Sequence, residues 1–125
     1  MLDIKSVISS FFRLQLSVKM LHWNTKNYNL HKITDKLHQD LLAITDRFVE
    51  TYLGRNQEEA EIVITKVDVD YISEAELLAY LEKIIDKVIL SDYYKNVDNE
   101  LRAIMDELLE LLYTNIYLLR TVKLE

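Results

Sequence analysis

The sequence contains no cysteine, no proline and a single glycine, Gly54. Without cysteine no disulfide can form, and the redox compartment cannot be read from the sequence. Because proline and glycine punctuate tight turns, their scarcity disfavours a sheet fold and favours long, uninterrupted helices. No apolar run approaches the length of a membrane span, and the first residues lack the order of a signal peptide. We therefore expect a cytoplasmic protein that has no membrane partner.

Positive charge is also scarce, since 15 Lys and Arg face 21 Asp and Glu and the net charge is −6. This balance disfavours a protein that binds nucleic acid by neutralising many phosphates, so DNA binding is not expected. With 125 residues, half of them apolar, the chain has the size of one domain that can bury a core. We expect residues 1–125 to form a single domain.

Apolar residues recur at three- and four-residue steps in four segments, which predicts an all-α fold. We expect these helices over residues 3–26, 30–53, 73–90 and 98–123, with a turn at residues 92–96. Local signals mark three of their ends. They are a candidate N-cap at Asp3, a C-terminal glycine at Gly54, and a capping box at Ser73 and Glu76.

Residues 55–72 separate the second and third predicted helices. Their IVITKVDVDY stretch alternates and is rich in β-branched residues, which favours an extended conformation. A lone strand cannot make a sheet, so we expect a crossover packed against the helices. A four-helix bundle with one long crossover between its second and third helices has the ferritin-like topology.

The chemistry-bearing residues gather on one face of the 30–53 helix. On a wheel of about 100° per residue, Asp35, His38, Asp46 and Glu50 fall within roughly a third of the circumference from His31. The apolar stripe lies near 240° on the same wheel, so these side chains face away from the helix's own core. The pairs His31/Asp35 and Asp46/Glu50 are each spaced to reach one ion. Imidazole and carboxylate ligands suit iron, manganese or zinc.

Each of these residues also has an ordinary interpretation. His22, near the end of the first helix, could be a capping or core-edge residue. Asp46 and Glu50 could be part of a solvated face, and Trp23 could fill the core or an interface. Only the joint pattern favours a metal site.

Three motifs carry that joint pattern: H-W-N-T-K at residues 22–26, L-H-x-x-x-D at 30–35 and D-x-x-x-E at 46–50. Together they resemble the signature of the Dps-type mini-ferritins, a ferritin-like family of iron-binding proteins, most clearly over residues 10–54. The chain is also similar to short Dps-like proteins of phages and large DNA viruses, for which the compartment would be the host cytoplasm.

The resemblance implies a homo-oligomer with a ferroxidase centre across a two-fold dimer interface. His22, His31 and Asp35 would come from one subunit, and Asp46 and Glu50 from its mate. Iron(II) would bind there and be oxidised by hydrogen peroxide or oxygen, which sequesters iron and limits peroxide damage. In this family the dimers build a dodecameric shell.

The resemblance also bears on two neighbours of that centre. Trp23 would pack beside it. His38 has no equivalent in the family motif, so it is either an additional or outer-shell group or an ordinary interface residue.

A di-iron site inside one bundle is not expected, because the chain has no E-x-x-H motif and its last two predicted helices have no histidine. The chain departs from the family in its short loop, with eight residues between His22 and His31, and in Asn27 and Thr51, where the family has Gly and Arg. It also lacks a Lys-rich N-terminal tail. Three classes remain: a ferroxidase, a structural or interaction bundle that has lost this activity, and, least favoured, a nucleic-acid condensing protein.

Overall fold

The computed structural model describes residues 3–56 and 61–122 and is all-α within them, with no β-strand. In chain order the elements are α1 (Ile4–Asn24), α2 (Tyr28–Asn56), a 3₁₀ turn η1 (Glu74–Glu76), α3 (Leu77–Leu90), α4 (Asp92–Asn96) and α5 (Asn99–Thr121). No helix in these ranges is long and apolar enough to cross a membrane.

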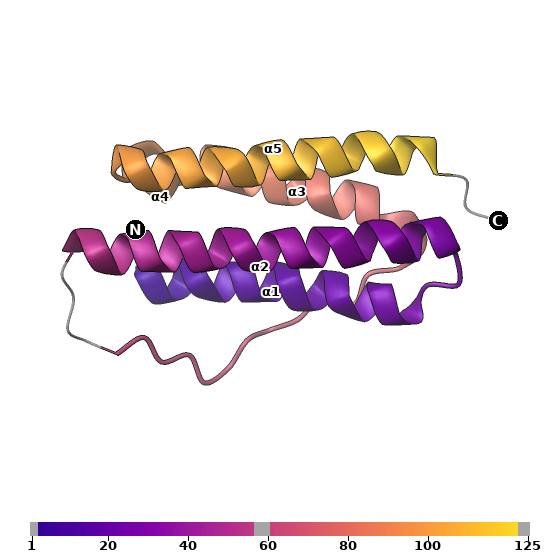
Figure 1. Ribbon diagram of the computed structural model, residues 1–125, viewed down its shortest axis with the longest axis horizontal. Helices are drawn as coiled ribbons and strands as arrows, with labels where there is room; N and C mark the ends of the chain where they lie inside the picture. The colour runs from indigo at the N-terminus through magenta and orange to yellow at the C-terminus, as the bar shows by residue number, and fades with distance from the viewer. Residues whose placement is uncertain (1–2, 57–60, 123–125) are drawn as a thin grey trace.

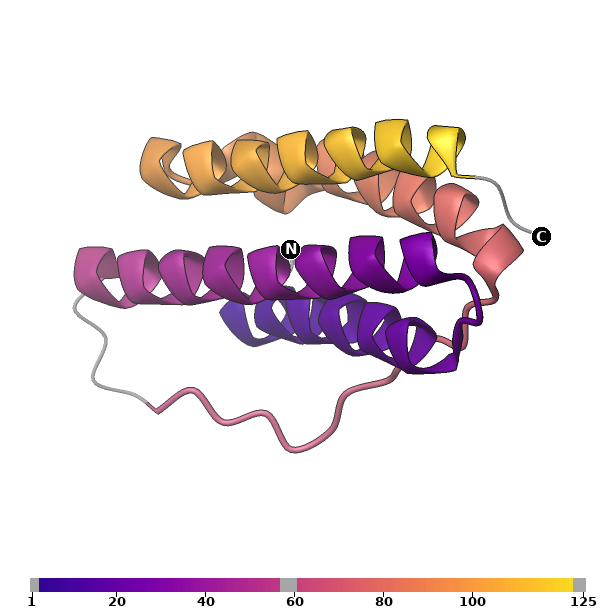
Figure 2. The ribbon, with the colours of Figure 1, turned by 45° about the vertical axis from the view of Figure 1, so that its right-hand side comes forward.

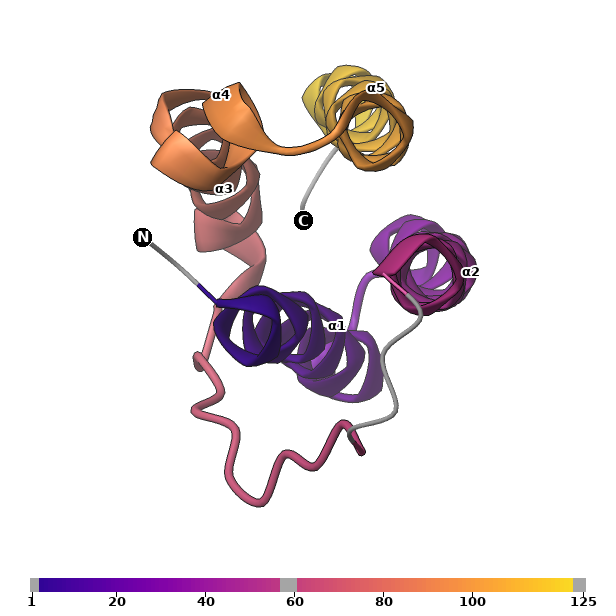
Figure 3. The ribbon, with the colours of Figure 1, turned by 90° about the vertical axis from the view of Figure 1, so that its left-hand side faces the viewer.

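The helices form two layers, with α1 beside α2 below and α3 beside α5 above (Figure 1). Seen end-on, the four longer helices occupy the corners of a square (Figure 3). Close packing joins α1 to α2, α2 to α5 and α5 to α3, whereas the fourth side, between α1 and α3, is packed less closely. Residues 61–73 run as an extended segment along the outer face of the α1–α2 layer, away from α5 (Figure 2).

One apolar core lies between the layers, and it uses the stripes that the sequence predicts. The rings of Phe11 on α1 and Phe48 on α2 meet at its centre, with centroids 5.3 Å apart. Burying one such side chain stabilises the fold by about 1.5–3 kcal/mol. The buried members of the predicted stripes include Val7, Leu14, Val18, Leu21, Leu37, Leu41, Ile44, Leu77, Leu81, Ile85, Leu101, Ile104, Leu108, Leu112 and Ile116. Ile33, whose position on the helical wheel also falls on the apolar stripe of α2, is only half-buried.

Two predicted helix starts are confirmed. Asp3 caps α1 by accepting a 2.8 Å hydrogen bond from the backbone N–H of Ser6. The capping box of Ser73 and Glu76 is present, with the Ser73 N–H donating to the Glu76 carboxylate at 3.0 Å. It opens the short turn η1, which leads directly into α3.

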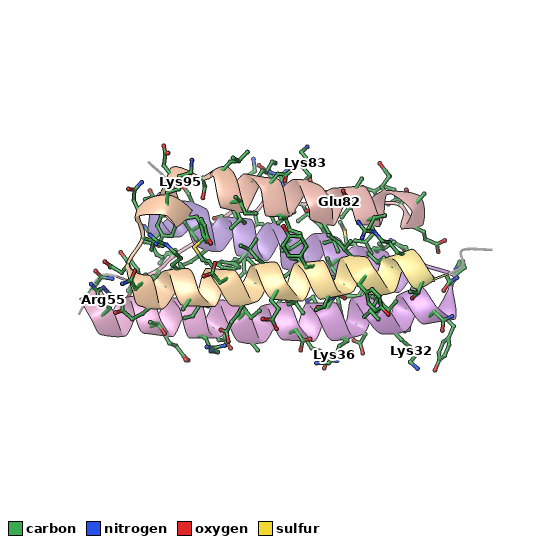
Figure 4. All side chains as sticks on the ribbon, turned by 90° about the horizontal axis from the view of Figure 1, so that it is seen from above. Lys32, Lys36, Arg55, Glu82, Lys83 and Lys95 are labelled. Atoms are coloured by element: carbon green, nitrogen blue, oxygen red, sulfur yellow. The ribbon has the colours of Figure 1, made fainter. Side chains whose placement is uncertain are left out.

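The predicted C-terminal role of Gly54 is wrong, because α2 continues through it to Asn56. The added turn brings Arg55 next to the start of α5, at the end of the molecule seen in Figure 4. There its guanidinium forms ion pairs with Asp98 at 2.6 Å and Glu100 at 3.1 Å. These contacts between distant segments favour the helical conformation over the local glycine signal.

The predicted turn at residues 92–96 is also wrong, since these residues form the short helix α4. Ser91 caps it by accepting a 3.1 Å hydrogen bond from the Tyr94 N–H. Arg102 of α5 holds the far end, donating to the carbonyl oxygens of Tyr94 and Lys95.

The crossover is extended as predicted, and its described part is residues 61–73; residues 57–60 lie outside the described ranges. Asp70 anchors it. The Arg13 guanidinium donates to both carboxylate oxygens, at 2.9 and 2.6 Å, and the Tyr80 hydroxyl donates at 2.9 Å. The Arg13 hydrogen bonds are the main reason that the pKa of Asp70 lies below its usual value. Burial is the main reason that the pKa of Tyr80 is raised to about 12.

Replacing Gly54 by Ala is expected to stabilise the protein by about 0.5–1 kcal/mol, because Gly is a poor residue within a helix. A Cβ at this position would meet no atom within 4 Å. Urea denaturation measures the free energy of unfolding. Ala43→Gly, at an exposed position of the same helix, is the control and should cost about as much. A destabilised Gly54→Ala protein would contradict the helical assignment of this residue.

Asp70→Asn is expected to lower the free energy of unfolding at neutral pH by about 1–2 kcal/mol, because it weakens charge-assisted hydrogen bonds. The folded-state pKa of Asp70 is lowered from 3.8, so its contribution is complete above that value and is lost as the pH falls through the lowered pKa. The gap between wild type and variant should therefore close in acid. Asp68→Asn, an exposed neighbour on the crossover, should show no comparable gap at any pH.

Candidate metal-binding half-sites on helix α2

Two histidines, His22 and His31, contact each other across the loop between α1 and α2. The Nδ1 atom of His22 lies 2.9 Å from the carbonyl oxygen of His31, and Nδ1 of His31 lies 2.9 Å from the carbonyl oxygen of His22. Their rings stack with centroids 3.9 Å apart. Since a carbonyl oxygen only accepts, both Nδ1 atoms must carry hydrogen. In the neutral rings the lone pair is therefore on Nε2, the nitrogen that remains for a metal ion.

The two rings differ in their surroundings. His22 is buried, whereas His31 is exposed at the surface. Thr34 lies 3.3 Å from His22 Nδ1 and donates its own hydroxyl hydrogen to the carbonyl oxygen of Leu30 at 2.8 Å. The hydroxyl oxygen is thus a second acceptor for the His22 ring. This packing gives His22 one orientation and leaves His31 as the outward-facing member of the pair.

Asp35 lies one turn after His31 and belongs to the same cluster. Its Oδ1 is 3.9 Å from Nε2 of His22, and its Oδ2 accepts a 3.2 Å hydrogen bond from Gln39. The structure therefore places His22 close to two other residues of the predicted site, with its ring stacked on His31 and its Nε2 3.9 Å from Asp35.

The short loop of residues 25–27, which joins the helices that carry these residues, is held in place by Glu74. Glu74 of η1 accepts hydrogen bonds from the Thr25 hydroxyl and, at 3.0 Å, from the Lys26 N–H. Chiefly through the Thr25 bond, these contacts lower the pKa of Glu74. The side chain of Asn27 accepts from the Leu30 N–H at 2.9 Å and so begins α2. Sequence reasoning missed Glu74, which no motif connects to the loop.

Trp23 and His38 flank the cluster. The indole of Trp23 is 67% exposed, and Lys19 Nζ lies 5.9 Å from the ring centroid. In the single chain Trp23 therefore fills no part of the core. The pKa of His38 is lowered by burial first, then by the charges of Lys19 and His22, with Asp35 opposing them. His38 thus lies near the cluster, and its predicted role beside the centre stays a prediction.

The second predicted pair, Asp46 and Glu50, lies elsewhere on α2. The distance from Asp35 to Asp46 along the helix is about 16 Å. Both carboxylates are exposed and line a pocket of about 420 Å³, whose other walls are apolar except for Thr45. These walls include Ile8 of α1 and Ile64 of the crossover. Within the described ranges of a single chain, no three His, Cys, Asp or Glu side chains form a group that could hold a metal ion.

Residues 22–119 match the family of unknown function DUF5856. The chain belongs to the DUF5856 family. The matched region begins at His22 and contains every predicted ligand, so both halves of the candidate site lie in the part that defines this family. Comparisons with curated proteins and with solved structures gave no match for this DUF5856 protein.

The hydrogen bonds to carbonyl oxygens predict the tautomer of two rings. Long-range ¹H–¹⁵N correlation spectra, recorded under alkaline conditions where the rings are neutral, should show His22 and His31 with hydrogen on Nδ1. His38 is the internal comparison, since it has no hydrogen-bonding partner in the part of the chain that the structure describes. Hydrogen on Nε2 in either His22 or His31 would contradict the reciprocal arrangement.

Proposed function

We propose that this DUF5856 protein is a Dps-like iron-binding protein that binds Fe(II) and oxidises it at a centre shared by two subunits. The observation that carries the proposal is the reciprocal pairing of His22 and His31. It commits both Nδ1 atoms to carbonyl oxygens and leaves both Nε2 atoms without that commitment, with the Nε2 of His22 3.9 Å from the carboxylate of Asp35. Imidazole and carboxylate are a ligand set that iron accepts, and one that zinc and manganese share.

The position of the other carboxylates supports a shared centre. His31 and Glu50 have the same midpoint in the sequence as Asp35 and Asp46, between residues 40 and 41. When two copies of α2 pack antiparallel about a two-fold axis at that midpoint, His31 faces the partner's Glu50. In the same register, Asp35 faces the partner's Asp46. Each half-site then meets the complementary half-site of the other copy, and two equivalent centres form per dimer.

The surface at that midpoint suits such a contact. Leu42 lies on the same face of α2 and is 44% exposed, although it is a large apolar side chain. Half-buried Val49 shares this face. Facing carboxylates would repel each other without a cation, and bound iron removes that repulsion. A dimer built here would therefore be stabilised by the ion that it binds.

We further infer that the helices form a ferritin-like four-helix bundle. The connections from α1 to α2 and from α3 to α5 are short, and a long one links α2 to α3, which is the arrangement of ferritin-like bundles. Iron would be sequestered in a homo-oligomer, with hydrogen peroxide or oxygen as the oxidant. A dodecameric shell is the assembly that the family resemblance favours.

The proposal predicts that His31→Ala and Glu50→Ala each abolish Fe(II) oxidation, because each removes a ligand from a different half of the centre. The rate is followed by the absorbance of the ferric product after addition of peroxide or air. Glu110→Ala, which removes an exposed carboxylate from α5, is the matched control and should oxidise iron at the wild-type rate.

Mixing the two inactive variants tests the shared centre itself. After denaturation and refolding together in equal amounts, half of the dimers are mixed, and each mixed dimer has one intact centre. About one quarter of the wild-type activity should return. A protein carrying both substitutions, refolded with itself, is the control and should stay inactive. No recovery in the mixture would contradict a centre built from two subunits.

The alternative is a structural or interaction bundle that lacks the activity. It predicts that the purified protein contains no iron and consumes no peroxide above background, while remaining folded. Native mass measurement combined with metal analysis separates it from the proposed ferroxidase.

A further inference from the structure

A second, unrelated pocket lies on the loosely packed side of the fold, between α1 and α3. Its volume is about 660 Å³, which is within the usual range for small-molecule sites. Its walls and floor are mainly apolar and reach the core at α5. They include Phe11, Leu14, Ile84, Val88 and Met105. The lining includes no residue of α2, so the pocket is separate from the candidate iron site.

Most polar groups in this pocket already have partners within the protein. Arg13 and Tyr80 both donate hydrogen bonds to Asp70, and Glu76 accepts one from the backbone N–H of Ser73. These bonds close one end of the pocket with the carboxylates neutralised or hydrogen-bonded. Of the two carboxylates in the lining, Asp70 is therefore already paired with a cation, Arg13.

Two ammonium groups of the lining remain. Lys83 and Lys87 lie one turn apart on α3, and neither forms a hydrogen bond or ion pair with any residue in the ranges described. Lys83 projects at the edge of α3 that is remote from α2 (Figure 4). In a protein with a net charge of −6, this is a local positive pair beside an apolar cavity. The pocket therefore combines an apolar interior with two lysines at its rim, of which Lys87 also acts electrostatically on Asp70.

We propose that this pocket binds a free fatty acid. The acyl chain occupies the apolar interior between α1 and α3, and the carboxylate is bound at the rim by the ammonium groups of Lys83 and Lys87. Charge complementarity favours an anionic head group, because neither lysine forms a hydrogen bond or ion pair within the described ranges.

Isothermal titration with decanoate, below its micelle concentration, tests the proposal. The wild-type protein should bind one decanoate with saturation. Decyltrimethylammonium, which has the same chain and the opposite charge, should bind much more weakly. Absence of saturable decanoate binding, or equal binding of both compounds, would overturn the proposal.

Two sets of variants locate the site. Lys83→Gln combined with Lys87→Gln should weaken decanoate binding by about tenfold, because it removes two charge-assisted contacts. Lys32→Gln combined with Lys36→Gln is the matched control, since these lysines have the same spacing on α2, at the opposite edge of the molecule (Figure 4). This control should bind decanoate like wild type. Equal losses in both double variants would mean that only general charge attraction had been measured.

The apolar part of the site has its own test. Ala79 is exposed and lines the pocket, so Ala79→Trp fills the cavity from its rim without removing any core side chain. It should abolish the binding of decanoate, with an unchanged helical circular dichroism spectrum. Undiminished binding would contradict this location. Binding to vesicles of anionic phospholipid without binding of decanoate would contradict a free fatty acid as the ligand.

Discussion

Helix α2 can turn only one face toward the core, and the rest of the structure depends on that choice. It packs against α1 and α5, and the side chains of Leu37, Leu41 and Phe48 are at most 1% exposed. Turning the helix by one residue, about 100°, would expose several of these side chains, each at a cost of about 1.5–3 kcal/mol. The direction of the candidate ligands is thus set by residues that have no chemistry of their own. The function proposed for this face therefore depends on hydrophobic packing at the opposite one.

Much of the fold could be predicted because its signals are local. The 3.6-residue period identifies the four longer helices, and Asp3 and Ser73 identify two of their starts through bonds made within three residues. The errors arise where contacts between segments far apart in the sequence determine the local conformation, or where an element is very short. Gly54 stays helical as Arg55 forms ion pairs with the start of α5, and α4 is too short for its period to be visible. Sequence patterns that depend on near neighbours cannot register either effect.

The candidate site also has one part that local sequence patterns predict and another part that they do not. The common face of His31, Asp35, Asp46 and Glu50 follows from helical geometry alone, and so does the distance between the two pairs. The stacking of His22 on His31 does not, because it requires the exact closure of the loop between α1 and α2. Glu74, which fastens this loop, comes from a segment 49 residues after Thr25. The pocket between α1 and α3 likewise depends on how closely the two helices approach each other. The sequence pattern of a single helix does not predict that distance.

The crossover has a consequence for the integrity of the chain. In the part of it that the structure describes, residues 61–69 form no backbone–backbone hydrogen bond, so nothing in the backbone shields their peptide bonds. The two helical pairs on either side of it, α1–α2 and α3–α5, adhere through the core and the ion pairs between α2 and α5. Covalent continuity through this segment is therefore not what holds the halves together. The protein therefore resembles a complex of two helical hairpins joined by one connecting segment. Cleavage of a single peptide bond in the crossover would leave the two hairpins associated.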